Sequence, residues 1–377
     1  MKTFTCIWVF LLLGLSLLPA QSKHPKIQQF LQSREWSVDL LWGNTVKHRE
    51  NMIFELPKSA RSIQIEMARQ TLGEAPWEPA LHQPRVGWIF SFLDYGNTPI
   101  LGTSYSLRPF IDYPLARYKP FSLYGRFGMG LAYNTRTFHP TENPLNNAIS
   151  SHLNIHPELG LLLTTQLTPH WGLRLGTLVA HQSNSKYKQP NLGLNSLQLR
   201  VGITYRHQAP EHAHKKDLLF RKTNVLHLIL QSGLGFKEEK IFGGPTYPVY
   251  HLKMGGGLYL GKIYHVMAGV GWEYDRAIQQ FIRDHDIQEI SNYGSPHVLS
   301  FWAGHEFLFR RMGIVTRGFY YLRPNPQVAD QWGMYIGPQF YLYPIHEGHR
   351  VNFYAGVYIK AHKAIADYIQ FSIGALL

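Results

Sequence analysis

The chain has 377 residues, a formal net charge of +13 and 20 histidines, yet only 16% of its residues are charged, against about 25% in an average soluble domain. Beyond the first residues no segment is apolar over the roughly 18 residues that a membrane helix needs, which excludes a helical membrane protein. Three interpretations of the positive charge compete: nucleic-acid binding, attraction to anionic lipid head groups, and a solvated excess without a partner.

The N-terminus predicts a secretory signal peptide. Lys2 gives a basic start, residues 7–18 form an apolar run interrupted only by small residues, and Ala-Gln-Ser at 20–22 matches a small-x-small cleavage site. We expect residues 1–22 to be removed, together with Cys6, the only cysteine. The exported chain then has no disulfide and no thiol chemistry, and export argues against nucleic acid as a partner.

Apolar residues alternate with small or polar ones along most of the chain. Phe121–Leu131 and the segments 195–205 and 332–342 follow this pattern, which puts one kind of residue on each face of a strand. Each segment is about ten residues long, the length of a tilted strand that spans a membrane. A soluble β-sandwich gives a similar alternation, but strand length and the 14% aromatic content favour a transmembrane antiparallel β-barrel whose small and polar face points inward.

The alternation predicts eight strands in each half of the chain. In the first half they lie near 36–46, 60–70, 85–96, 100–116, 121–136, 151–168, 170–184 and 193–206. In the second half they lie near 224–236, 249–261, 263–275, 296–309, 312–323, 331–343, 350–361 and 366–377.

A polar stretch rich in His and Lys separates the halves. Turns on the periplasmic side of one barrel are usually short, so we interpret residues 208–223 as a linker between a barrel at 23–207 and a second barrel-like half at 224–377. One sixteen-stranded barrel is the alternative. We expect residues 276–286 to form either a short helix in a loop or a plain loop.

Other motifs carry less information. Residues 179–183 align with residues 360–364, each near the end of a next-to-last strand, but five residues are a weak match and we favour chance. The run Gly255–Gly257 lies within a strand pattern and indicates small residues at a barrel wall rather than a phosphate loop. The histidines in Glu211–Lys215 indicate a solvated linker rather than a metal site.

His181 and Ser183 form the most informative pair in the sequence. Residues two apart in a strand share a face, so both point the same way as the apolar Leu175 and Val179. A serine hydroxyl needs a base to take its proton, and His is the usual base. The pair therefore predicts ester hydrolysis on a face that meets lipid. The alternative is that both are interfacial residues near a strand end, where polar groups meet head groups.

Two asparagines complete the candidate site. Asn195 shares the parity of the outward residues in its strand, and the hairpin can place it beside His181, whose other ring nitrogen needs a partner. Asn184 follows Ser183 directly, where its side-chain amide or nearby backbone N–H groups could stabilise an oxyanion.

The surrounding residues resemble the PagL family of lipid A deacylases, whose relatives are often named acyloxyacyl hydrolases. The segments that carry the resemblance are His181-Gln182-Ser183-Asn184, Pro190-Asn191-Leu192-Gly193-Leu194-Asn195, Val201-Gly202-Ile203-Thr204-Tyr205, Gly128-Met129-Gly130-Leu131-Ala132-Tyr133-Asn134-Thr135 and Asn146-Asn147-Ala148-Ile149-Ser150-Ser151. They cover roughly residues 36–207. The ending Lys360-Ala361-His362 with Ala366-Asp367 resembles longer members that carry a second half.

This resemblance implies an eight-stranded barrel in the outer membrane of a Gram-negative bacterium that removes an ester-linked acyl chain from lipid A without a cofactor or metal. Its partners would be lipid A, lipopolysaccharide and outer-membrane lipids. His181 and Ser183 match the first two members of the family's His–Ser–Glu triad, and Asn184 matches its oxyanion asparagine. The position of the glutamate is Asn195 here, a departure that puts activity in doubt more than fold. The competing hypotheses are a non-catalytic structural barrel and a pore.

Overall fold

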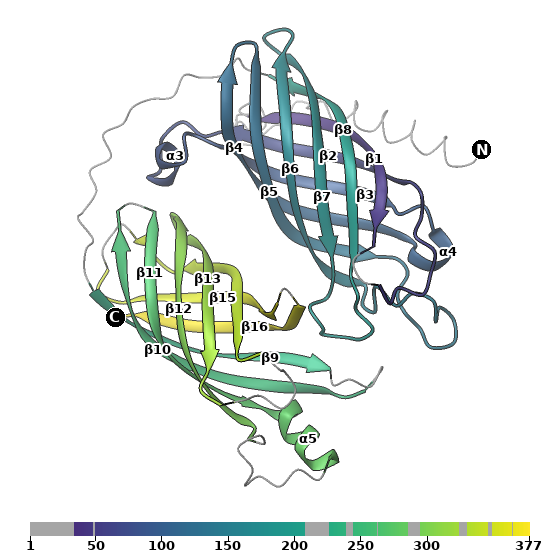
Figure 1. The fold of residues 1–377 in the computed structure, drawn as a ribbon. Helices are drawn as coiled ribbons and strands as arrows, with labels where there is room; N and C mark the ends of the chain where they lie inside the picture. The colour runs from purple at the N-terminus through teal and green to yellow at the C-terminus, as the bar shows by residue number, and fades with distance from the viewer. Residues whose placement is uncertain are drawn as a thin grey trace, which may run out of the picture.

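The computed structural model describes residues 34–47, 50–207, 226–238, 244–261, 263–285, 295–323, 330–345, 349–363 and 365–377. The expected signal peptide at 1–22 and linker at 208–223 lie outside these residues. The described chain forms two closed antiparallel barrels of eight strands each (Figure 1). The all-β fold is therefore confirmed, and it is built as two barrels rather than as the single sixteen-stranded alternative.

The first barrel contains β1 (Glu35–Val46), β2 (Ala60–Gln70), β3 (Arg85–Asp94), β4 (Thr103–Tyr118), β5 (Phe121–Asn134), β6 (Leu153–Gln166), β7 (Trp171–Gln182) and β8 (Leu194–Arg206). The second contains β9 (Leu226–Glu238), β10 (Thr246–Leu260), β11 (Tyr264–Asp275), β12 (His297–Phe309), β13 (Met312–Tyr321), β14 (Trp332–Tyr341), β15 (Asn352–His362) and β16 (Ile365–Leu376). The short helices are α3 (Trp77–Ala80), α4 (Thr98–Leu101) and α5 (Arg276–Asp284).

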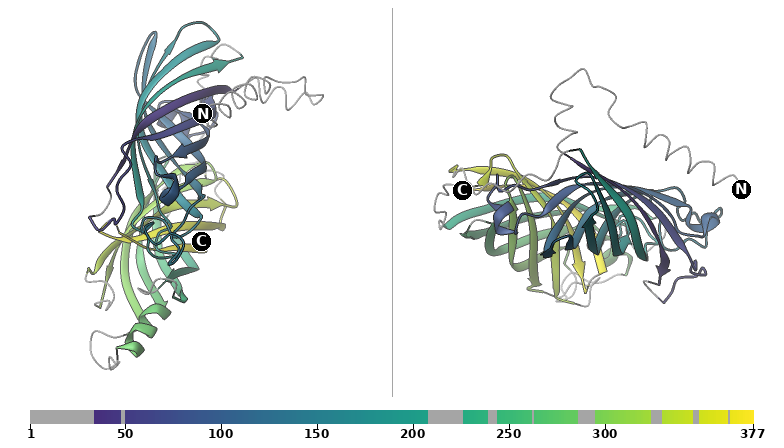
Figure 2. Two further views of the ribbon diagram at one scale, coloured as in Figure 1. Left: turned by 90° about the vertical axis from the view of Figure 1, so that its right-hand side faces the viewer. Right: turned by 90° about the horizontal axis from the view of Figure 1, so that it is seen from above.

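Each barrel closes through its first and last strands. β1 pairs with β2 on one side and with β8 on the other, where Glu35 lies opposite Arg206 and Val46 opposite Asn195. β9 pairs with β10 and β16 in the same way. Figure 2 shows the same two barrels from two further directions, the first coloured purple to teal and the second green to yellow. Closure leaves no unpaired strand edge, which a lipid environment requires.

The strands obey the alternation that the sequence predicts. Along β8, Leu197, Leu199 and Val201 are exposed, while Gln198 and Arg200 are buried. The exposed leucines and valines form an apolar outer surface, and the buried polar side chains point into the barrel. This arrangement is the reverse of a soluble protein and suits a barrel surrounded by lipid.

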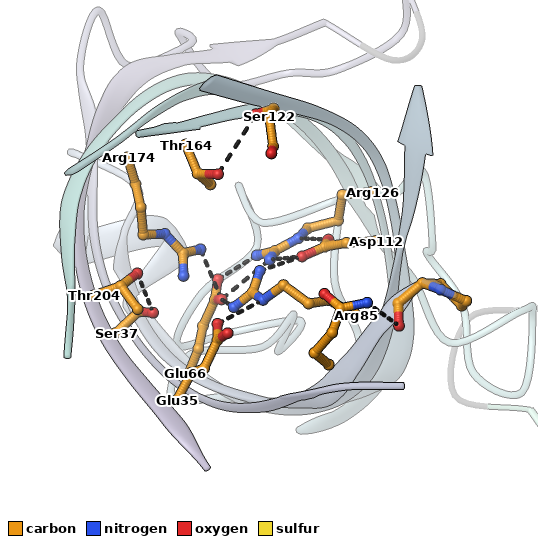
Figure 3. Close-up of polar contacts among 12 residues, drawn as sticks. Glu35, Ser37, Glu66, Arg85, Asp112, Ser122, Arg126, Thr164, Arg174 and Thr204 are labelled. Atoms are coloured by element: carbon orange, nitrogen blue, oxygen red, sulfur yellow. Dashed lines mark hydrogen bonds and ion pairs between the residues drawn. The ribbon is translucent and has the colours of Figure 1, made fainter. Parts of the chain in front are cut away.

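Ion pairs fill the lumen of the first barrel (Figure 3). The Arg126 guanidinium contacts Asp112 at 2.6 Å and also pairs with Glu66, while Arg85 contacts Asp112 at 2.5 Å and Glu35 at 2.9 Å. The same buried network continues through Arg108, Arg174, Arg200, Asp39 and Glu158. Because the opposite charges neutralise each other and fill the space, this lumen is a packed core, as expected for eight strands.

The second barrel has a more aromatic interior. Lys360 contacts Glu273 at 2.5 Å, Arg317 donates to Gln231 at 2.6 Å, and the hydroxyl of Tyr358 donates to Gln339. Buried rings surround these polar groups, among them Trp302, Phe319, Tyr321, Tyr335 and Tyr368. This lumen, too, is occupied by side chains.

The weak repeat between residues 179–183 and 360–364 is not a structural repeat. Lys360 and His362 are buried on the inner face of β15, whereas Val179 and His181 lie on the outer face of β7. The aligned residues therefore point to opposite sides of their barrels, in agreement with a chance match.

The helices explain small departures from the predicted strands. The helical alternative for residues 276–286 is confirmed by α5, which Asp275 caps by accepting hydrogen bonds from the N–H groups of Ala277 and Ile278. The fourth strand begins at Thr103 rather than near 100, because Asn97 caps the four-residue helix α4. Within the described residues, no helix is long and apolar enough to cross a membrane.

Candidate active site

The candidate site lies at the end of the first barrel that carries the longer loops. The connections at 47–59, 95–102, 135–152 and 183–193 belong to this end, while the opposite end has the turns at 119–120 and 167–170 and one longer connection, 71–84, which contains α3. Outer-membrane barrels have short periplasmic turns and longer extracellular loops. The end formed by the last residues of β7 and the first residues of β8 is therefore the extracellular one.

The β7–β8 hairpin brings His181 and Asn195 directly opposite each other. The distance from His181 Nδ1 to Asn195 Oδ1 is 2.7 Å. An amide oxygen only accepts hydrogen bonds, so the imidazole donates through Nδ1–H. The lone pair then lies on Nε2, the tautomer that a general base needs.

Ser183 continues the outward face of β7 beyond the end of the strand. Val179 is exposed, His181 and Ser183 are partly exposed, and Ala180 and Gln182 are buried, as the parity of the strand predicts. Ser183 still pairs with Ile155 of β6 through two backbone hydrogen bonds of 2.8 and 3.2 Å, so its backbone is fixed.

Gly193 shapes the space beside the imidazole. Its φ of 78° lies in the left-handed region, and its backbone N–H donates to the carbonyl of Ala148 at 3.0 Å. A Cβ atom at this position would lie 2.5 Å from Cε1 and 3.1 Å from Nε2 of His181. Glycine is therefore required both by the backbone conformation and by the close approach of the ring.

Asn184 is buried, and its hydrogen bonds hold the loop that follows Ser183 in place. Its side-chain amide donates to Ser150 Oγ and to the carbonyl of Lys188, each at 3.0 Å. Its backbone N–H donates to Asn191 Oδ1 at 3.1 Å. One hydrogen of the side-chain amide is thus bound within this loop, at Lys188, and the other by Ser150 of the connection at 135–152. The side-chain amide and the backbone N–H of Asn184 therefore both have partners within the protein.

Gln182 fixes the strand between the two candidate catalytic residues. Its side chain points into the barrel, where its amide oxygen accepts hydrogen bonds from Tyr95 Oη at 2.5 Å and Asn134 Nδ2 at 3.0 Å. Its amide nitrogen donates to Ser104 Oγ at 3.1 Å. These contacts of Gln182 inside the barrel were not predicted from the sequence. Their positions follow from strand parity, but their partners come from strands distant in the sequence.

The described part of the chain contains no group of three or more His, Cys, Asp or Glu residues arranged to hold a metal ion.

The first barrel is closed, with an apolar outer face and a charged lumen. These features define an outer-membrane β-barrel. Its candidate site lies on the outer face near one rim. Residues 25–204 match the family model for lipid A 3-O-deacylase (PagL), and residues 224–375 match the model for the C-terminal domain of acyloxyacyl hydrolase. The chain belongs to this family of lipid A deacylases. Membership indicates a hydrolase that acts on lipid A in the outer membrane of a Gram-negative bacterium.

Solved structures that resemble the chain are bacterial outer-membrane barrels. Neisserial surface protein A is 13% identical, with a TM-score of 0.33, and covers 46% of this chain and 97% of its own. The β domain of the Bordetella autotransporter BrkA is 10% identical, with a TM-score of 0.23, over 91% and 98%. Outer membrane phospholipase A from Escherichia coli is 10% identical, with a TM-score of 0.17, over 90% and 95%. The comparison with curated proteins returned no match.

Proposed function

We propose that the first barrel hydrolyses an ester-linked acyl chain of lipid A with Ser183 as nucleophile, His181 as general base and Asn195 as the residue that orients the imidazole. The observation that carries this proposal is the 2.7 Å contact from His181 Nδ1 to Asn195 Oδ1 on the outer face of β7 and β8. It leaves Nε2 unprotonated on the same face as the Ser183 hydroxyl.

The proposed reaction needs only these side chains, lipid and water. His181 Nε2 takes the hydroxyl proton as Ser183 Oγ attacks the carbonyl carbon of the ester. The tetrahedral intermediate expels the sugar oxygen, which receives the proton from His181. Water, deprotonated by the same imidazole, then attacks the acyl-serine ester, releases the fatty acid and restores the serine hydroxyl.

Asn195 does part of the work that a glutamate does at this position in the family. Its amide oxygen holds His181 in the required tautomer, but a neutral amide stabilises the imidazolium less than a carboxylate does. Replacing the acid of a serine triad can cost on the order of 10⁴ in rate where it also leads to the wrong tautomer. Since the tautomer is supported here by the 2.7 Å contact, we propose slow but real turnover.

Asn184 in this proposal is a positioning residue for the oxyanion site. Its buried amide joins this loop, at Lys188, to Ser150 of the connection at 135–152. Ser185 and Lys186, which follow Asn184, have φ values of 52° and 61°. We assign the donation to the oxyanion to backbone N–H groups of this loop other than that of Asn184, which Asn191 binds. Preorganised donors of this kind contribute on the order of 10²–10³ in rate.

The ester attacked is proposed to be one linked to the sugar of lipid A in the outer leaflet. Both Ser183 and His181 lie at the extracellular rim, with the exposed Val179 and Leu175 below them on the same strand. Acyl chains can lie along these apolar side chains while the sugar stays at the head-group level. The description of the matching family model supports the 3-O-linked chain as the one released.

Mass spectrometry of lipid A tests the proposal. Wild type incubated with purified lipopolysaccharide should release one fatty acid and lower the mass of lipid A by one acyl chain, and Ser183→Ala should release none. Equal release by wild type and Ser183→Ala would exclude Ser183 as the nucleophile. A control with the ester already removed should give no further product.

The second candidate is a structural barrel without catalysis, and the neutral Asn195 in place of the family glutamate favours it. In that case wild type and Ser183→Ala would both leave lipid A intact.

A pore is a further alternative, and the side chains inside both barrels argue against it. Salt bridges occupy the first barrel, and a buried Lys–Glu pair and tyrosines occupy the second. Conductance in a planar bilayer separates the pore from the other two functions.

A further inference from the structure

The loop that follows Ser183 contacts the second barrel. The end of β9 reaches it through Glu238, whose carboxylate accepts a hydrogen bond from the backbone N–H of Gln189. The side chain of Gln189 donates to the carbonyl of Glu238 at 3.3 Å, and the N–H of Glu238 donates to the carbonyl of Lys186 at 3.5 Å. Three hydrogen bonds therefore join the candidate catalytic loop to a single residue of the other barrel.

A second contact joins the barrels at their opposite end. The ring of Trp77, in the helix α3 between β2 and β3, packs edge-on against Phe309 at the end of β12, with 5.6 Å between ring centroids. Gln189 follows β7 and Glu238 ends β9, which are both odd-numbered strands. Trp77 follows β2 and Phe309 ends β12, which are both even-numbered strands. Each contact thus joins equivalent ends, which is the arrangement of two barrels that share one orientation in a membrane.

One peptide group links Glu238 to the candidate site. The peptide between Lys188 and Gln189 gives its N–H to the Glu238 carboxylate. The carbonyl of the same peptide accepts hydrogen bonds from Asn184 Nδ2 at 3.0 Å and from Ser150 Oγ at 2.8 Å. Asn184 is in turn the residue directly after Ser183. The path from the second barrel to the nucleophile is therefore a carboxylate, one peptide and one amide side chain.

The negative charge of Glu238 strengthens the hydrogen bonds along this path. Hydrogen bonds to an ionised carboxylate are about twice as strong as neutral ones. A peptide whose N–H is bound in this way becomes a better acceptor at its carbonyl, because hydrogen bonds in a chain polarise one another. Glu238 itself is buried, so its carboxylate is shielded from competing water. Breaking this contact would loosen the hold of the Lys188 carbonyl on Asn184.

We propose that Glu238 is a positioning residue for the ester-hydrolysing site, and that the second barrel serves the first by holding the loop that carries Asn184. This inference rests on the proposed function for its effect on rate. The holding of the loop by Glu238 can be measured without activity, so the two can fail separately.

The first arm of the test is hydrogen exchange of the full chain in detergent, followed by mass spectrometry of peptides from the loop 184–192. Glu238→Ala should raise exchange in this loop, while Asp330→Ala should leave it unchanged. Asp330 is a matched control, because it is an acidic residue of the second barrel whose ion pair is with the exposed Lys363. Unchanged exchange in Glu238→Ala would overturn the proposal, whether or not the wild type deacylates lipid A.

The second arm measures kcat and KM for fatty-acid release from lipopolysaccharide. Misplacement of a catalytic group by about 1 Å can cost on the order of 10²-fold, so Glu238→Ala should lower kcat by about 10- to 100-fold with little change in KM. Glu238→Gln, whose amide oxygen can still accept from Gln189, should recover part of the loss. Heat-modifiable migration in gels verifies that each variant is folded. An unchanged kcat in Glu238→Ala, or an equal fall in Asp330→Ala, would overturn the positioning role.

Discussion

The imidazole of His181 and the side-chain amide of Asn195 face each other across the β7–β8 hairpin, 2.7 Å apart, on the outer face of a barrel whose lumen is filled by salt bridges. The two residues are direct partners in the strand register. Cross-strand neighbours of this kind have Cβ atoms about 5 Å apart, which suits a direct contact between the two side chains. The hairpin therefore holds the imidazole in place by a side-chain contact between two paired strand residues.

Gly193→Ala should displace His181 and lower the rate of deacylation on the order of 10²-fold. The new Cβ would lie 2.5 Å from Cε1 of the imidazole, and the backbone φ of 78° is itself unfavourable for alanine. Fatty-acid release from lipopolysaccharide measures the effect. Gly261→Ala is the matched control, since Gly261 has a φ of 69° but no atom within 4 Å of the new Cβ. Equal losses in the two variants would assign the effect to backbone strain rather than to the imidazole.

Glu66→Gln should destabilise the first barrel by about 3–5 kcal/mol, the cost of removing one partner from a buried ion pair. Glu66 pairs with Arg126 and lies 2.7 Å from Arg174, and both guanidinium groups would lose a counter-charge. The free energy of unfolding in urea and detergent micelles measures this cost. In comparison, Lys363→Ala removes an exposed ion pair with Asp330 and should cost less than about 1 kcal/mol. A loss for Glu66→Gln as small as for this control would mean that the network tolerates an unpaired arginine.

Residues 23–207 expressed alone should fold into a heat-modifiable barrel. β1 pairs directly with β8 from Glu35 to Val46, so the first barrel needs no strand from the second half to close. Migration in gels with and without heating measures folding in detergent. A fragment that never folds, although the full chain does, would show that the contacts of Gln189 and Trp77 with the second barrel are needed for assembly.

Strand parity predicted most of the barrel and the direction of the site residues. The alternation places Ser183 and His181 on the apolar face, and the exposed Val179 and buried Gln182 of β7 follow that prediction. Parity fixes which face a side chain occupies, because the period of a strand is two. It also shows why the match between residues 179–183 and 360–364 fails, since Lys360 points inward.

Parity does not reveal partners that depend on closure or on loops. The contacts of Gln182 with Tyr95 and Asn134 join strands that the sequence separates widely, and only the register of the closed barrel brings them together. Asn184 was expected beside an oxyanion, but its buried amide is bound to Ser150 and Lys188. A loop conformation with positive φ values is set by such local hydrogen bonds, for which the hydrophobic pattern carries no signal.

The last prediction concerns the glutamate position of the family. Asn195→Glu should raise the rate of deacylation at least tenfold, with an upper limit on the order of 10⁴, because a carboxylate at this position stabilises the imidazolium that forms on His181. Asn195→Leu should lower the rate below wild type, since its side chain cannot accept the Nδ1–H bond that now spans 2.7 Å. Ser183→Ala should abolish activity in both the native and the Asn195→Glu backgrounds. Lipid A mass spectrometry over a time course measures all four variants.

If Asn195→Glu releases no more fatty acid than Ser183→Ala, the catalytic mechanism is wrong and the structural barrel is the better description. A gain in Asn195→Glu that survives Ser183→Ala would instead point to a nucleophile other than Ser183.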